Sequence, residues 1–134
     1  MANDGIRVNL AADRLMSEAI AYAEPLAKES LLRRMLNDTK EYVPYRTGAL
    51  SDSGTVSLPT SSIMFTEEYA PYAFEPIAPS GKRKVYTHLH NQKAGGNPME
   101  RATEELSDEW VQFYKQELIR YVNEWIREHP KRVG

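Results

Sequence analysis

The stretch that decides the fold runs from residue 43 to residue 54 and reads Val43-Pro44-Tyr45-Arg46-Thr47-Gly48-Ala49-Leu50-Ser51-Asp52-Ser53-Gly54. Proline disfavours helical geometry at the residue before it, so a preceding helix should end near Pro44. Glycine adopts a positive φ at little steric cost, which suits Gly48 to a turn. The stretch therefore predicts the end of a long helix, a turn and the start of an extended segment. We interpret it as a structural junction, with a buried Leu50, formed by Pro44, Thr47, Gly48, Leu50 and Ser53.

Before this junction, apolar residues recur at helical spacing from about Leu10 to Tyr42. Steps of three or four residues separate Met16, Ile20, Ala23, Ala27, Leu31 and Met35, as on one face of a helix. Pro25 lies inside this run and removes one backbone donor, so it predicts a kink or a break near residues 23–24. Residues 1–9 precede the pattern and are predicted to form an N-terminal arm.

After the junction, two short β-prone runs at residues 55–58 and 63–66 flank the turn-forming residues 59–62. This arrangement predicts an antiparallel hairpin. Residues 67–75 could form a helical turn or an irregular loop, and the alternating residues 85–90 could add a third strand. Loops are predicted on either side of that strand, because residues 76–84 contain Pro76, Pro79 and Gly81 and residues 91–97 contain Gly95 and Gly96. We expect both loops to be mobile.

The last element is a second long helix. Pro98 suits the first turn of a helix, Asn97 suits its cap, and Glu100 favours the positive helix start. A period near 3.6 relates Ala102, Leu106, Trp110, Phe113 or Tyr114, Leu118, Tyr121 and Trp125. The helix should end at about Glu128, before Pro130, which leaves residues 129–134 as a C-terminal tail. Two long helices around a small antiparallel sheet predict an α+β fold in a single domain, residues 1–134.

The aromatic residues of this second helix lie on more than one of its sides, and a small sheet cannot cover all of them. Exposed aromatic patches mark contacts with other proteins. We therefore predict an interface that includes Trp110, Tyr114, Tyr121 and Trp125. The alternative is that these side chains form core against the first helix.

Composition limits the classes of function. The chain of 134 residues has no cysteine, which excludes disulfides and thiolate chemistry, and its net charge of −2 gives no general attraction to nucleic acid. No apolar run approaches the roughly 20 residues that span a bilayer. The N-terminal residues lack the layout of a secretory signal, so we expect a cytoplasmic protein without membrane contact.

Candidate chemistry is sparse. His88 and His90 would point to one face of a strand, as in some metal sites, but no third ligand has a supporting spacing. Ser51, Asp52 and Ser53 suit turn hydrogen bonds better than catalysis. We predict no enzyme, no metal and no cofactor. The basic run Lys82, Arg83 and Lys84 could touch DNA phosphates or an acidic partner, or could be a solvated loop tip.

Two motifs carry a family resemblance. The first is Tyr42-Val43-Pro44, followed by Thr47-Gly48-Ala49-Leu50 and Ser53, and the second is Tyr69-Ala70-Pro71-Tyr72 extended by Ala73-Phe74-Glu75. With a long helix before them and a helix from Ala102 to Trp125 after them, they resemble minor capsid and head–tail neck proteins of tailed bacteriophages over roughly Leu10 to Trp125. Some relatives carry Tyr-Gly or Glu-Phe-Gly-Thr where this chain has Phe74-Glu75-Pro76-Ile77. Neck protein, tail completion protein and tail terminator therefore stay open.

The resemblance implies a virion protein without enzymatic activity, a ring subunit that joins the DNA-filled head to the tail and lies in the host cytoplasm before assembly. Its partners would be further copies of itself in a hexamer or dodecamer, and the adjacent connector-side and tail-side proteins, with transient proximity to DNA. Interface candidates from the loops are Tyr69, Tyr72, Phe74, Lys82, Arg83 and Lys84. Two rival readings remain: a small regulatory or immunity module that binds one partner, and a DNA-binding protein that uses residues 82–84.

Overall fold

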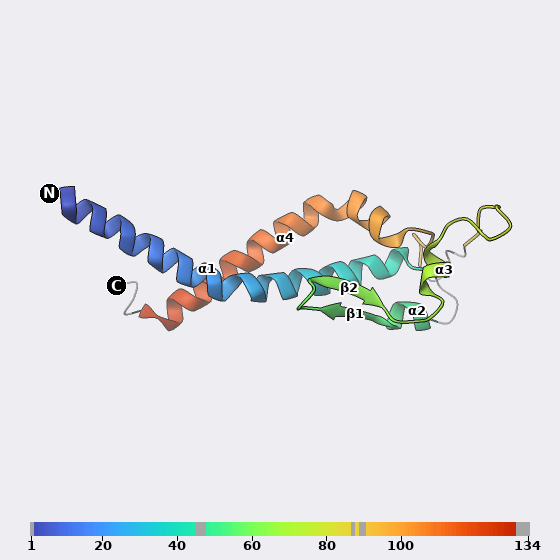
Figure 1. The fold of residues 1–134 in the computed structure, drawn as a ribbon, viewed down its shortest axis with the longest axis horizontal. Coiled ribbons are helices and arrows are strands. Elements are labelled where there is room, and N and C mark those ends of the chain that lie inside the picture. The colour runs from blue at the N-terminus through green and yellow to red at the C-terminus, as the bar shows by residue number, and fades with distance from the viewer. Residues whose placement is uncertain (1, 45–47, 87, 89–90, 131–134) are drawn as a thin grey trace. The chain divides into compact units, whose positions relative to one another are not determined.

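The computed structural model describes residues 2–44, 48–86, 88 and 91–130, and for residues 2–12 it describes the backbone alone. In chain order the elements are helix α1 (Ala2–Thr39), a 3₁₀ turn η1 (Lys40–Tyr42), helix α2 (Ala49–Asp52), strands β1 (Gly54–Ser57) and β2 (Ser62–Phe65), helix α3 (Ala70–Phe74) and helix α4 (Pro98–Glu128) (Figure 1). The chain is thus a small α+β fold with a long N-terminal helix, a two-stranded antiparallel sheet and a long C-terminal helix, as predicted.

Contacts divide the chain into two compact units. Unit 1 comprises residues 1–30 and 112–134, and unit 2 comprises residues 31–111. The two long helices each run through both units, so the prediction of a single domain stays a prediction. Within the described residues, the helices and strands of unit 1 are parts of α1 and α4, whereas unit 2 also holds the sheet and the short helices.

Helix α1 differs from the prediction at its start. It begins at Ala2, so residues 2–9, which we expected as an N-terminal arm, are helical. The sequence did not predict this start, because Asn3, Asp4 and Gly5 are poor helix formers and the apolar periodicity begins only after them. The helix continues through Pro25 without a break. Of the two alternatives at that residue, the break is wrong and the kink stays a prediction.

The junction forms the expected turn and leads into the extended segment β1 at Gly54, but one unpredicted turn of helix lies between them. Gly48 has a φ of 86°, in the left-handed region, and one turn of helix, α2, follows it directly. The N–H of Asp52 donates to the Gly48 carbonyl at 2.9 Å, and the hydroxyl of Ser53 donates to the Leu50 carbonyl at 2.7 Å. Leu50 is buried, with 3% of its surface exposed. Of the two other predicted junction residues, Pro44 is half-buried, and Thr47 lies outside the described residues.

The hairpin is confirmed, one residue earlier than predicted on each strand. The register pairs Gly54 with Phe65 and Ser57 with Ser62. Gly54 lets β1 lie close to α1, because a Cβ at this position would be 2.6 Å from Leu36 Cδ1. Within the described residues the sheet has two strands. Val85, which could have started a third strand, is in neither of them.

Two apolar clusters form the core of unit 2. In the first, Tyr42 packs with Ala102 and Trp110 of α4, and in the second, Val43, Leu50 and Ala70 pack together against Phe65, Ala73 and Phe74. Tyr42 and Val43 are adjacent in sequence and fully buried. Tyr42, the last residue of η1, thus belongs to the first cluster and Val43, which follows it, to the second, so the backbone here connects the two clusters.

Helix α4 has the bounds that the sequence predicted, Pro98–Glu128. Asn97 precedes it with a φ of 50°, which is not the extended geometry of an ordinary N-cap. Its carbonyl accepts the N–H of Arg101 at 3.1 Å, and its own N–H donates to the Phe74 carbonyl at 2.7 Å. Asn97 thus joins α4 to the end of α3.

Candidate functional site

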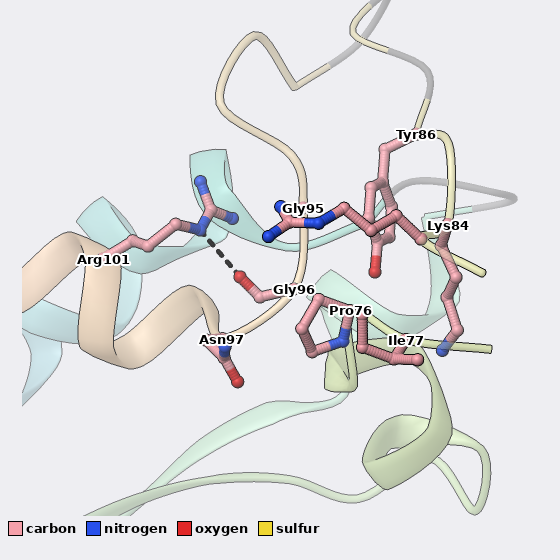
Figure 2. Close-up of a pocket in the computed structure, with 9 residues that line it drawn as sticks. Pro76, Ile77, Lys84, Tyr86, Gly95, Gly96, Asn97 and Arg101 are labelled. Atoms are coloured by element: carbon pink, nitrogen blue, oxygen red, sulfur yellow. Dashed lines mark hydrogen bonds between the residues drawn. The ribbon is translucent and has the colours of Figure 1, made fainter. Parts of the chain in front are cut away.

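A pocket of about 440 Å³ opens in unit 2 next to the start of α4. We call it the basic pocket, because Arg83, Lys84 and Arg101 line it and no carboxylate is among its described lining residues. The remaining lining residues are Pro76, Ile77, Tyr86, Gly95, Gly96 and Asn97. Figure 2 shows Arg101 on one side of the pocket, with Lys84 and Tyr86 on the other.

One wall of the basic pocket is a short hairpin that the sequence did not predict. Ile77 and Arg83 form an antiparallel bridge, the N–H of Ala78 donates to the Lys82 carbonyl at 2.8 Å, and the N–H of Lys84 donates to the Pro76 carbonyl at 3.0 Å. Gly81, with a φ of 85°, makes the tight turn between the two sides. Residues 76–84 are outside the helices and strands, as expected of a loop, but this pairing gives them local order that the two prolines permit, because they lie where no N–H is needed.

Lys84 is held on the wall by an aromatic neighbour. Its Nζ donates to the carbonyl of Tyr72 and lies 3.7 Å from the centre of the Tyr72 ring. A cation over a tyrosine face is attracted by the negative charge of the ring face. This contact brings together two of the predicted interface residues, from α3 and from the basic run.

The opposite wall depends on two glycines. A Cβ at Gly96 would lie 2.6 Å from Cβ of Pro76 and 2.8 Å from its Cα, so only glycine fits there without a shift. Ala94, Gly95 and Gly96 are buried, and the N–H of Gly95 donates to the Tyr42 carbonyl at 3.2 Å. Residues 91–97 form a loop, as expected, and its mobility stays a prediction; within the loop, Gly96 allows the close approach to Pro76.

Arg101 ties this wall to the core. Its Nε donates to the Gly96 carbonyl at 2.7 Å, its Nη1 to the Lys93 carbonyl at 2.8 Å and its Nη2 to the Tyr42 carbonyl at 3.1 Å (Figure 2 shows the first). A guanidinium has five N–H groups, so three are used and two are left. Arg101 can therefore hold the loop in place and still offer its charge to a ligand.

Beneath Arg101, three polar side chains form a network. The buried Tyr42 hydroxyl donates to Glu105 Oε2 at 2.5 Å, and Lys93 Nζ donates to the same oxygen at 3.0 Å and to the Tyr42 hydroxyl at 3.2 Å. The hydrogen bond from Tyr42 and then the one from Lys93 lower the pKa of Glu105. Burial first, and then the bond to Glu105, raises the pKa of Tyr42. The network keeps Glu105 charged and fixes α4 against residues 42 and 93.

The predicted interface residues differ in how exposed they are. Tyr69 and Tyr72 are exposed, Tyr72 with 58% of its surface, whereas Phe74 is half-buried and packs edge-on against Phe65 with ring centres 5.3 Å apart. Lys82 and Arg83 are exposed and Lys84 is half-buried.

On α4, two of the predicted interface residues belong to the core. Trp110 is 4% exposed and donates its Nε1–H to Asp38 Oδ2 at 2.8 Å, and Trp125 is 6% exposed and stacks on His129 with ring centres 4.3 Å apart. Burial of both indoles contradicts their assignment to an exposed aromatic surface and favours the alternative, that these side chains form core. Tyr114 and Tyr121 are half-buried, and the Tyr121 hydroxyl lies 3.4 Å from Ser30 Oγ.

Sequence reasoning missed most of the basic pocket, since only Arg83 and Lys84 of its described lining residues were predicted as site residues. Arg101, Tyr86, Gly95, Gly96 and Asn97 were not predicted as site residues. The available signal was the pair of glycines directly before a helix with a cation in its first turn. Nothing in the sequence connects these residues to Arg83, because the hairpin at residues 76–84 brings them together.

Other chemistry has little support in the described residues. They contain no group of three histidine, aspartate or glutamate side chains that could hold a metal ion. His88 Nε2 donates to the Ala94 carbonyl at 3.1 Å, and His90 lies outside the described residues. Within that part of the chain, no helix combines the length and the apolar character that crossing a membrane requires.

In comparisons with known proteins, no protein-family model, no curated protein and no solved structure matches this chain.

Proposed function

We propose that this protein is a structural component of a tailed-bacteriophage virion, a ring subunit of the head–tail neck. The proposal starts from the resemblance of two short motifs, residues 42–53 and residues 69–75. It takes the protein to be an assembly part, whose function is to present rigid surfaces to further copies of itself and to the proteins on either side of the ring.

One observation carries the proposal. The two motifs are separated by fifteen residues, yet Val43 and Leu50 from the first pack with Ala70 from the second in one buried cluster. The two motifs therefore form one structural unit, which supports treating them as a single resemblance.

Exposed apolar side chains support contacts with other proteins. Large apolar residues with more than half of their surface exposed occur in both units: Met64, Tyr72, Val85, Val111 and Ile119. Val85 is 96% exposed. Side chains of this size gain about 1.5–3 kcal/mol each when they are fully removed from water, so covering several of them in an assembly contributes to its stability.

Gene disruption tests the proposal directly. A phage that carries this coding sequence is propagated with the sequence interrupted, and lysates are imaged by electron microscopy. We expect DNA-filled heads and free tails that do not join, with joining restored when the protein is supplied from a plasmid. Normal particles in the disrupted phage would show that the protein is not a neck component.

A further inference from the structure

We infer that the basic pocket receives carboxylates from a second copy of this chain, supplied by an acidic stripe on the outer side of α4. We define the acidic stripe as Glu100, Glu104 and Asp108. This inference rests on the proposed function, because it names the contact between neighbouring subunits of the ring.

The basic pocket has unused donors. No hydrogen bond or ion pair within the described residues engages the side chain of Arg83, which is exposed at the rim. Arg101 has two N–H groups left after its three bonds to backbone carbonyls. Two carboxylates act on lining residues from outside the pocket: Glu75, whose Oε1 accepts the N–H of Ile77 at 3.4 Å, and Glu105, which binds Tyr42 and Lys93. The described lining itself holds three cations and no carboxylate.

The acidic stripe has the opposite imbalance. Its three residues are four positions apart on α4, so they share one side of the helix. All three are exposed, and no ion pair within the described part of the chain includes them. Like charges at this spacing destabilise a helix by a few tenths of a kcal/mol per pair. A cationic partner would relieve that repulsion.

The charges favour a second copy over DNA. The chain has a net charge of −2, so a polyanion that extends beyond the pocket meets repulsion from the rest of the surface. A carboxylate side chain enters alone, and it forms the paired hydrogen bonds with a guanidinium that planar groups allow.

The contact joins two different surfaces, the basic pocket of one copy and the acidic stripe of the next. Such a contact is heterologous, so each copy keeps one free pocket and one free stripe until rotation closes the ring. A heterologous contact can therefore extend through successive subunits until the ring closes, whereas a contact between identical surfaces would stop at a dimer.

Charge reversal tests the contact. Sedimentation velocity across a range of protein concentrations measures self-association of the wild type, of Arg83→Glu and of Glu104→Arg. We expect each single variant to weaken association by roughly tenfold or more. Lys115→Glu, a matched reversal at an exposed position of α4 outside both surfaces, should leave association unchanged. Circular dichroism should show the same thermal unfolding for all four proteins, since exposed charges contribute little to stability.

Complementation distinguishes the contact from a general effect of charge. The double variant Arg83→Glu/Glu104→Arg, and an equimolar mixture of the two single variants, should associate again because each restores opposite charges at every contact. Failure of both to recover, or a wild type that stays monomeric throughout the range, would overturn the inference. So would binding of a short DNA duplex by the wild type that Arg83→Glu removes.

These results are separable from the proposed function. Self-association with the predicted charge pattern stands even if disruption of the gene leaves heads and tails joined. Conversely, heads and tails that stay apart support the neck function, whatever side chains make the subunit contact.

Discussion

Replacing Gly96 by alanine tests whether residues 91–97 are packed as the structure describes. The new Cβ would lie 2.6 Å from Cβ of Pro76 and 2.8 Å from both its Cα and its N. Carbon atoms are at their best separation at about 3.5–4.0 Å, so the overlap is about 1 Å, against a backbone and a ring that cannot rotate away. Overpacking of this kind costs about 2–3 kcal/mol.

Thermal unfolding followed by circular dichroism measures this cost. A chain of 134 residues loses about 4 °C in melting temperature per kcal/mol, so Gly96→Ala should melt about 8–12 °C below the wild type. The matched control is Gly95→Ala, whose Cβ meets only the end of the Arg101 side chain, at 2.9 Å from Nη2. Displacing that group costs about one hydrogen bond, or about 1 kcal/mol and 4 °C. A Gly96→Ala protein that melts within about 2 °C of the wild type, or a larger loss for Gly95→Ala, would refute the packing.

Three further changes test the core, the junction and the polar network. Leu50→Ala should lower the free energy of unfolding in urea by about 2–5 kcal/mol, because Leu50 is 3% exposed; a loss below 1 kcal/mol would contradict its place in the core. Gly48→Val should lower the free energy of unfolding by about 1–2 kcal/mol or more, because valine is strained at a φ of 86°. Ser51→Ala should leave the free energy of unfolding nearly unchanged, because the buried Ser51 hydroxyl has no partner within the described residues. Unchanged stability of Gly48→Val would make the turn assignment wrong. Since the folded state lowers the pKa of Glu105, its contribution to stability is complete above the ordinary glutamate pKa of about 4.3 and is lost as the pH falls through the lowered value. The wild type should therefore exceed Glu105→Gln in stability at pH 7 and lose that advantage as the pH falls below the ordinary value; a difference that stays constant with pH would exclude this linkage.

Much of the fold could be predicted because the signals are local. Pro98 and Pro130 bracket the 3.6-residue period of α4, and its observed bounds match the prediction. Gly48 supplies the positive φ that the junction requires, and β-prone runs on both sides of a turn predict the hairpin. Each of these features depends on neighbours within a few residues, so the sequence displays them directly.

The candidate site could be predicted only in part, because its residues are far apart in the chain. Arg83 and Lys84 attracted notice as a basic run, whereas Arg101 resembled any charged residue in a helix. The same limitation explains the errors on α4. Trp110 and Trp125 were assigned to an interface because periodicity reports that a helix has an apolar side, but not which partner covers it.

The sequence by itself determined the order long helix, hairpin, long helix, the turn at Gly48 and the burial of Leu50, because backbone sterics and hydrophobic periodicity act over short distances. Only the tertiary structure decided what the glycines at 95 and 96 are for, and which cations line a pocket. Gly96 is required by the approach of Pro76, twenty residues away, and Arg101 meets Arg83 because hydrogen bonds fold residues 76–84 back on themselves. Distances of that kind are set by packing between segments, which no local pattern encodes.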